Sequence, residues 1–272
     1  MNILDKIVAQ KRLEIAAAKA AKSQGALERE PLFSRPTLSL ADALRRADAP
    51  GIISEFKRQS PSKGIINGNV EPEVVTAGYV ATGAKGLSIL TDGPFFGGSF
   101  ADFSKARAAN PTTPMLRKDF MIDEYQLFEA KALGADVILL IAACLSPQEI
   151  RTLAQKAREL SMEVLLEVHD ADELAQSLCD AVDMVGVNNR NLKTFSTSVE
   201  TSVELAAQIP DRFVKISESG LKDAETIVRL FEQGYQGFLI GETFMKTPDP
   251  ATALESLQKD LFKLIEQKPS LL

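Results

Sequence analysis

The chain has 272 residues, of which 45% are hydrophobic and 25% are charged, and its formal net charge is −6. This composition is typical of a soluble globular protein, and the acidic balance argues against nucleic acid as a partner. Any site for an anion must therefore be a local basic pocket.

Cys144 and Cys179 fall in no metal-binding or redox spacing, and His169 is the only histidine. A histidine-based triad or a multi-histidine metal site therefore has too few residues to be built. Two thiols in a chain of this size indicate a reducing compartment. We also find no signal-peptide core and no run of about 18 apolar residues, so we expect a cytoplasmic protein without a membrane span.

Residues 1–48 are expected to form an N-terminal helical extension. Ile3, Leu4, Ile7 and Val8 recur at helical spacing, and an alanine-rich run continues the pattern to Ala21. A second short helix is predicted from Ser39 to Arg46. The extension is too small for a core of its own, so it either caps one end of the main domain or forms a partial lid over a ligand.

Residues 49–272 alternate short apolar runs with segments of helical periodicity. Eight runs are predicted as strands: Gly51–Lys57, Gly86–Thr91, Thr113–Arg117, Asp136–Ile141, Glu163–Val168, Met184–Val187, Phe213–Ile216 and Gly237–Ile240. Near-continuous apolar strands separated by helices indicate a parallel sheet covered on both faces. We therefore predict an α/β fold, a single-domain (β/α)8 TIM barrel, whose usual size is about 250 residues. No Gly-x-Gly-x-x-Gly turn follows the first strand, so a dinucleotide-binding fold is disfavoured.

The first predicted strand carries two charges on one face. Ile53, Glu55 and Lys57 alternate with Ile52, Ser54 and Phe56, so Glu55 and Lys57 point to the same side. Burying two charges costs free energy and therefore requires a reason. The simplest reason is an ion pair that closes the end of the barrel, and the alternative is a catalytic site.

Charged residues also end two other predicted strands. Lys118 follows the third strand and Glu167 lies in the fifth, and alternate strands of a barrel contribute to the same side-chain layer. Lys57, Lys118 and Glu167 are therefore expected to converge as an acid–base set. Each lysine is expected to have a lowered pKa because the other is a neighbouring cation. His169 shares a face with Glu167, but the sequence offers it no evident partner.

The last two strands lead into small residues. Ser219-Gly220 and Gly241-Glu242 each precede a helix, where backbone N–H groups can bind an anion, and Ser60 can add a hydroxyl. For Glu242 we expect the backbone N–H rather than the carboxylate to face the anion. Asn188 and Arg190 are suited to binding hydroxyls or a carboxylate. Phe95, Phe96 and Phe120 lie in loops at the same end, where they bind a ring or simply pack the loops.

Five ordered motifs identify a resemblance. They are Glu55-Phe56-Lys57-Arg58-Gln59-Ser60-Pro61-Ser62-Lys63-Gly64, Leu116-Arg117-Lys118-Asp119-Phe120, Leu166-Glu167-Val168-His169, Asn188-Asn189-Arg190-Asn191-Leu192 and Ser217-Glu218-Ser219-Gly220-Leu221. With them the chain resembles the indole-3-glycerol phosphate synthase family of tryptophan biosynthesis over about residues 1–265. Asn191 departs from the pattern, because an acidic residue is more usual there.

The resemblance implies ring closure, decarboxylation and dehydration of 1-(2-carboxyphenylamino)-1-deoxyribulose 5-phosphate. It implies that Lys118 is the general acid, that Glu167 is the base, and that Lys57 binds the substrate carboxylate and can donate a second proton. It also implies supporting roles for further residues: Glu55 and Asn188 in catalysis, and Arg190, Phe120, Ser60, Ser219, Gly220, Gly241 and Glu242 in substrate binding. No metal or organic cofactor is implied. We expect a monomer or weak homodimer, and association with other tryptophan-pathway enzymes stays open.

Two other hypotheses compete with the indole-3-glycerol phosphate synthase interpretation. A Schiff-base aldolase on the same barrel would use Lys118 or Lys57 as its nucleophile. A non-catalytic barrel that senses a phosphorylated metabolite would keep the anion site but would have little use for Lys57, Lys118 and Glu167 together.

Overall fold

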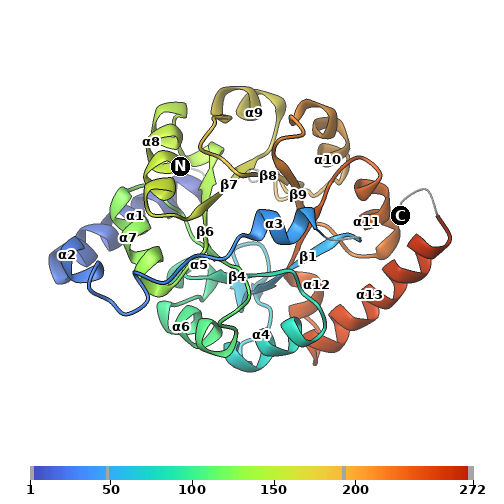
Figure 1. The fold of residues 1–272 in the computed structure, drawn as a ribbon, viewed down its shortest axis with the longest axis horizontal. Coiled ribbons are helices and arrows are strands. Elements are labelled where there is room, and N and C mark those ends of the chain that lie inside the picture. Colours follow the sequence, from blue (N-terminus) through green and yellow to red (C-terminus); the bar gives the residue numbers. More distant parts are fainter. Residues whose placement is uncertain (1–2, 47–48, 192–193, 269–272) are drawn as a thin grey trace.

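The computed structural model describes residues 3–46, 49–191 and 194–268. Parallel strands close into a barrel in the order β1-β10-β9-β8-β7-β6-β5-β4, with helices around it (Figure 1). The strands are β1 (Gly51–Phe56), β4 (Gly86–Leu90), β5 (Met115–Lys118), β6 (Val137–Ile141), β7 (Glu163–Val168), β8 (Met184–Asn188), β9 (Val214–Glu218) and β10 (Gly237–Ile240). The predicted TIM barrel is confirmed. The proposed bounds of 1–48 and 49–272 include positions outside the described residues.

Three strands run further than the sequence indicated. β5, β8 and β9 end at Lys118, Asn188 and Glu218, whereas we had predicted their ends at Arg117, Val187 and Ile216. The apolar pattern stops at these polar residues, but the ladder continues, with Leu90 opposite Lys118 and Asn188 opposite Glu218. Polar side chains are therefore held by the sheet itself rather than by loops.

The barrel helices begin and end at recognisable signals. The helices are α4 (Pro72–Ala81), α6 (Phe100–Ala109), α7 (Glu124–Leu133), α8 (Pro147–Glu159), α9 (Ala171–Ser177), α10 (Glu200–Leu205), α11 (Ala224–Phe231) and α13 (Pro250–Glu266). Ser146 and Glu149 form a capping box at the start of α8, with Pro147 at its first position. Gly134 ends α7 with φ 83°, a left-handed conformation that glycine adopts without strain.

Several short elements escaped the sequence analysis because they are too short to show a period. They are the antiparallel pair β2 (Gln59–Ser60) and β3 (Gly64–Ile65), the helix α5 (Gly93–Phe96), and the 3-10 turns η1 (Ala142–Cys144) and η2 (Ala206–Gln208). The short helix α12 (Glu242–Met245) begins at Gly241-Glu242, where a helix was expected. No helix in these described ranges is both long and apolar enough to cross a membrane.

Strand alternation divides the core into two regions. Ile53, Leu116 and Leu165 belong to the cluster inside the barrel, whereas Ile52 and Phe56 pack in the larger cluster between strands and helices. The face that carries Ile53 therefore also carries Glu55, and the face with Leu165 also carries Glu167. The alternation of strand side chains that forms the core therefore also directs the side chains of Glu55 and Glu167 into the barrel.

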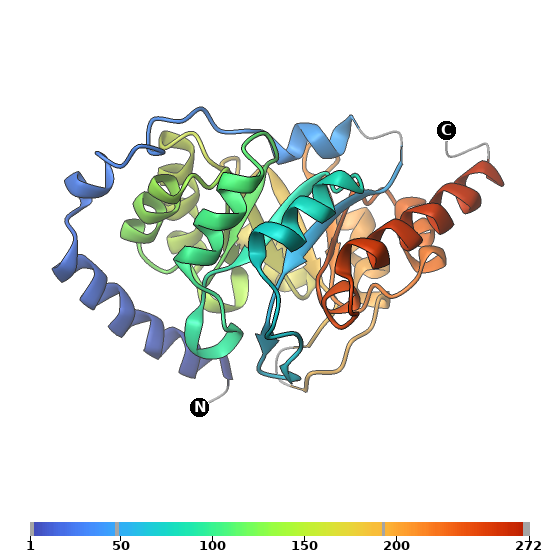
Figure 2. The same cartoon turned by 90° about the horizontal axis from the view of Figure 1, so that it is seen from below.

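The N-terminal extension has parts at both ends of the barrel, and its role as a partial lid stays a prediction. It consists of α1 (Ile3–Ala21), α2 (Gln24–Leu27) and α3 (Leu40–Arg45). α3 closes the end where the strands begin: an added Cβ at Gly51 or Gly86 would come within 2.5 Å of the side chains of Leu44 or Leu40. The start of α1 lies at the opposite end, the same end of the barrel as the hairpin β2–β3 (Figure 2). α3 therefore caps the end of the barrel where the strands begin, and the start of α1 lies at the end where the strands finish.

Candidate active site

A cavity of about 420 Å³ opens at the carboxyl ends of the barrel strands. It is lined by every residue that we named for catalysis or substrate binding: Glu55, Lys57, Ser60, Lys118, Phe120, Glu167, Asn188, Arg190, Ser219, Gly220, Gly241 and Glu242. Residues that lie far apart in sequence thus converge on one cavity, as the barrel topology requires. Their individual roles stay predictions.

Lys118 lies at the centre of the cavity between two carboxylates. Its Nζ is 2.6 Å from Oε2 of Glu218 and 3.1 Å from Oε2 of Glu167. Burial alone would lower the pKa of Lys118, but Glu218, Glu167 and Glu55 together raise it above its ordinary value. Our expectation of a lowered pKa was wrong for Lys118, because carboxylates rather than the second lysine dominate its surroundings.

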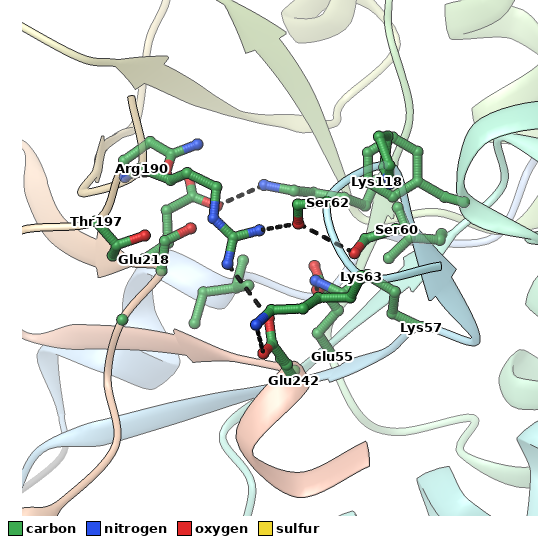
Figure 3. Close-up of a pocket in the computed structure, with 18 of the residues that line it drawn as sticks. Glu55, Lys57, Ser60, Ser62, Lys63, Lys118, Arg190, Thr197, Glu218 and Glu242 are labelled. Atoms are coloured by element: carbon green, nitrogen blue, oxygen red, sulfur yellow. Dashed lines mark hydrogen bonds and ion pairs between the residues drawn. The ribbon is translucent and has the colours of Figure 1, made fainter. Parts of the chain in front are cut away.

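Lys57, which directly follows β1, is held by a residue of that strand. Its Nζ lies 2.5 Å from Oε1 of Glu55 (Figure 3). The other oxygen of Glu55 accepts a hydrogen bond of 3.3 Å from Ser88. The pair predicted from strand alternation is therefore present, and it forms one wall of the cavity rather than merely closing the barrel. Gly241 allows this arrangement, because an added Cβ there would stand 2.5 Å from Oε1 of Glu55.

Glu167 is surrounded by groups that favour its charged form. Oε1 accepts a hydrogen bond of 2.9 Å from Nδ2 of Asn188, and Oε2 binds Lys118. Burial would raise the pKa of Glu167, but Lys118, His169 and the amide of Asn188 hold it below its ordinary value. Glu167 is thus an ionised carboxylate that can accept a proton.

Glu218 is the main site residue that our sequence analysis missed, although it lies within a quoted motif. It lines the same cavity from β9 and is 3% exposed. Burial and the nearby charge of Glu167 raise the pKa of Glu218, despite the contact with Lys118. The signal was available: Val214, Ile216 and Glu218 alternate on the inward face of a strand whose extent we had placed too short.

His169 has partners that the sequence did not reveal. Its Nδ1 lies 3.1 Å from Oε2 of Glu173, and its Nε2 lies 3.5 Å from Oε1 of Glu167. Our expectation of no evident partner was wrong, because Glu173 in the first turn of α9 folds back onto the ring. Burial would lower the pKa of His169, but Glu173, Glu167 and Glu218 raise it.

The opposite side of the cavity is suited to an anion. Ser219 and Gly220 both have positive φ, 70° and 78°, and consecutive residues of this kind can turn backbone N–H groups toward an anion. Arg190 donates to Oγ of Ser62 at 3.1 Å and to Oε2 of Glu242 at 3.3 Å. The Oγ atoms of Ser60 and Ser62 lie 3.4 Å apart, which places Ser60 beside this group (Figure 3).

The carboxylate of Glu242 contacts two cations, Arg190 and Lys63. Its Oε1 lies 3.7 Å from Nζ of Lys63, while its other oxygen accepts from Arg190. The carboxylate thus occupies the surroundings that we had expected to be left to a bound anion. Lys63 and Ser62 are two further lining residues that we did not single out within the first motif.

The third part of the cavity is apolar. The rings of Phe96 and Phe120 are tilted with centroids 5.9 Å apart, and both residues line the cavity. Ile3, Leu4 and Ile7 of α1 line it as well. Phe120 is therefore placed as predicted, and the N-terminal helix supplies part of the wall.

The cavity combines three chemical environments: a buried centre of lysines and carboxylates, an apolar wall that fits a ring, and a group of cations, hydroxyls and turned backbone that fits an anion. In the part of the chain that the structure describes, no cluster of three His, Cys, Asp or Glu side chains could hold a metal ion.

Comparisons with known proteins place this chain in a family. The family model described as indole-3-glycerol phosphate synthase matches residues 4–257. The indole-3-glycerol phosphate synthase of Bacteroides thetaiotaomicron is 49% identical over 95% of this chain and 98% of that protein. The protein of the same name from Albidiferax ferrireducens is 44% identical over 94% of this chain and 98% of its own length.

A solved structure supports the fold alone. 3-Hexulose-6-phosphate synthase from Salmonella typhimurium superposes with a TM-score of 0.62 at 12% identity, over 78% of this chain and 99% of that chain. The family match over nearly the whole chain carries more information than this shared architecture. The chain therefore belongs to the indole-3-glycerol phosphate synthase family.

Proposed function

We propose that this chain converts 1-(2-carboxyphenylamino)-1-deoxyribulose 5-phosphate into indole-3-glycerol phosphate, CO2 and water. Family membership supports the activity. The observation that carries the assignment of residues is the convergence of Lys118 and Glu167 between an apolar wall and an anion site in one cavity. The substrate has the same three parts in the same order: an arene, a reacting ketone and a phosphate.

The two ends of the cavity fix the substrate. The phosphate binds at Ser219 and Gly220 with Ser60 nearby, while the arene lies against Phe96 and Phe120. With both ends held, the ring carbon that bears the carboxylate is pressed toward the ketone. Such positioning converts an unfavourable encounter into a favoured one.

Lys118 is the general acid for ring closure. The ring carbon attacks the ketone carbon, and the π electrons of the carbonyl move to oxygen, which takes a proton from Nζ. The raised pKa of Lys118 keeps the amine protonated and ready to donate, and the forming alkoxide is still more basic. Glu218 and Glu167 hold the ammonium group in place. Loss of CO2 then returns the bonding electrons to the ring and restores aromaticity.

Glu167 is the base for dehydration. The hydroxyl formed in the first step leaves as water after it gains a proton, and Glu167 removes the proton whose loss completes the indole double bond. The hydrogen bond from Asn188 orients the carboxylate for this transfer. Lys57 binds the substrate carboxylate beside Glu55, and the choice between Lys57 and Lys118 as the second donor stays open.

The same charges disfavour a Schiff-base aldolase. A nucleophilic lysine must be neutral, and the carboxylates around Lys118 favour its charged form. The oligomeric state, a monomer or weak homodimer, and the cytoplasmic location stay predictions.

The direct test is to supply the carboxyphenylamino substrate and record the appearance of indole fluorescence together with release of CO2. We expect the wild-type chain to form both products, and borohydride added during turnover to leave activity intact. Failure of the folded wild-type protein to form indole product would overturn the assignment. A reduced lysine adduct that stops turnover would favour the aldolase instead.

A further inference from the structure

α1 carries a lysine that is almost completely buried. Lys11 is 4% exposed, and its Nζ lies 3.0 Å from Oδ2 of Asp92, 2.9 Å from Oδ1 of Asp119 and 2.7 Å from Oε2 of Glu14. A buried ammonium group is costly unless it is paired, so these carboxylates explain why it can be buried. None of the chemistry described above uses Lys11.

Both aspartates hold the aromatic wall of the cavity. Asp92 follows β4 and caps α5, because its Oδ1 accepts the N–H of Phe95 at 2.9 Å, and α5 carries Phe96. Asp119 directly follows Lys118, and its Oδ1 accepts the N–H of Phe120 at 2.8 Å. One ammonium group on α1 thus joins the two segments that present Phe96 and Phe120.

The two aspartates depend on Lys11 to different degrees. Asp119 has a second cation, because its Oδ2 lies 3.0 Å from Arg117, and it also accepts from Thr91 at 2.6 Å. For Asp92, Lys11 is the cation that the structure places in contact, within the described residues. Burial already raises the pKa of Asp92, so without Lys11 this fully buried carboxyl would favour its neutral form and the link between α1 and the two segments would be lost.

We propose that Lys11 is a positioning residue of the arene subsite: it ties α1 to Asp92 and Asp119 and so fixes the wall formed by Phe96, Phe120 and Ile7. The inference deepens the proposed function and rests on it for the identity of the ring. The contacts of Lys11 with Asp92 and Asp119 do not depend on the proposed function. The N-terminal helix is then a structural part of the substrate pocket, held by one buried charge.

The chain offers a matched control on the same helix. Lys19 also pairs with an aspartate after β5, with 2.7 Å between its Nζ and Oδ2 of Asp123, but its side chain is 47% exposed. Lys11→Met and Lys19→Met make the same chemical change in one helix. The first removes a buried tie to the wall, and the second removes an exposed pair that is worth little.

The first measurement is hydrogen–deuterium exchange in peptides that cover residues 3–15, 91–97 and 118–122. We expect faster exchange in all three for Lys11→Met and wild-type exchange for Lys19→Met. Wild-type exchange in Lys11→Met would overturn the tie. Hydrogen–deuterium exchange does not require turnover, so it tests the positioning role of Lys11 even if the proposed reaction is not observed.

The second measurement is steady-state turnover. For Lys11→Met we expect KM to rise by about 10-fold with kcat within about 3-fold of wild type, because ring positioning rather than chemistry is affected. The Ki for inorganic phosphate should stay unchanged, because the anion site is formed by residues that follow β9 and by the hairpin β2–β3, none of which contacts Lys11. An unchanged KM, or an equal loss of phosphate binding, would contradict the assignment.

A second variant covers the case in which Lys11→Met does not fold. In Lys11→Met/Asp92→Asn both partners are neutral, asparagine can still cap α5, and Asp119 keeps Arg117. We expect a folded protein in which exchange at residues 3–15 and KM stay raised, because the tie is absent. Wild-type values for both in this variant would refute the role of Lys11.

Discussion

Gly241→Ala tests whether close packing against Glu55 sets the geometry of the charged centre. The new Cβ would lie 2.5 Å from Oε1 of Glu55, 3.0 Å from its Cβ and 3.1 Å from its Cδ. Ordinary contact begins near 3.4 Å, so the carboxylate must retreat by roughly 0.9 Å. Glu55 cannot swing aside freely, because it is 3% exposed and binds Lys57 and Ser88.

The displacement predicts a catalytic defect larger than a folding defect. A misplacement of about 1 Å typically costs about 100-fold in rate, or about 2.7 kcal/mol of barrier. Overpacking of this kind costs on the order of 1–3 kcal/mol of folding stability. We therefore expect kcat to fall by about two orders of magnitude in a protein that is still folded at 25 °C.

The assay is indole fluorescence for kcat and KM, with thermal unfolding of the same samples. Gly68→Ala is the matched control, because its added Cβ meets nothing nearer than 3.6 Å, and it should keep the wild-type kcat. A folded Gly241→Ala variant with the wild-type kcat would show that the position of Glu55 does not limit catalysis.

Three further predictions concern the charged centre. Lys118→Ala should lower kcat by about 10³-fold or more with the circular dichroism of a folded barrel, and ordinary turnover would remove Lys118 as the acid. Glu167→Gln should accumulate the hydroxylated intermediate before dehydration, as seen by transient kinetics, whereas weakened binding alone would exclude Glu167 as the base. The pKa of Glu218 is raised in the folded state, so its stabilising contribution is present at low pH and lost as pH rises above the ordinary carboxyl value of about 4.3. The unfolding temperature of Glu218→Gln relative to wild type should therefore increase between pH 5 and pH 8, and a constant difference would contradict the shift.

The barrel could be predicted from the sequence because the hydrophobic patterns of its strands and helices are both unambiguous. Runs such as Val137–Ile141 are apolar on both faces, and the helices between strands have clear starts such as Ser146 with Glu149. The alternation that places Ile53 inside the barrel also places Glu55 and Lys57 on one side. Convergence of the strand ends then follows from topology alone.

What the sequence could not supply are properties that depend on several strands at once. The pKa of Lys118 is set by carboxylates of β1, β7 and β9, and we had considered only the other lysine. Glu218 escaped notice because the apolar run that marks its strand stops two residues earlier, at Ile216. The buried position of Lys11 depends on how α1 docks, which no pattern within residues 1–48 specifies.

The charge balance of the centre links these corrections. Glu55, Glu167 and Glu218 surround the cavity with Lys57 and Lys118, so three carboxyl groups meet two ammonium groups. Buried charges that do not balance change their protonation, and the carboxyl with the raised pKa is the one that takes up a proton most readily. With Glu218 protonated, two carboxylates balance two lysines: Glu55 with Lys57, and Glu167 with Lys118, while an oxygen of Glu218 still accepts a hydrogen bond from Lys118. The cavity can then hold an ionised base and a protonated acid side by side near neutral pH, which an acid-catalysed ring closure followed by a base-assisted dehydration requires.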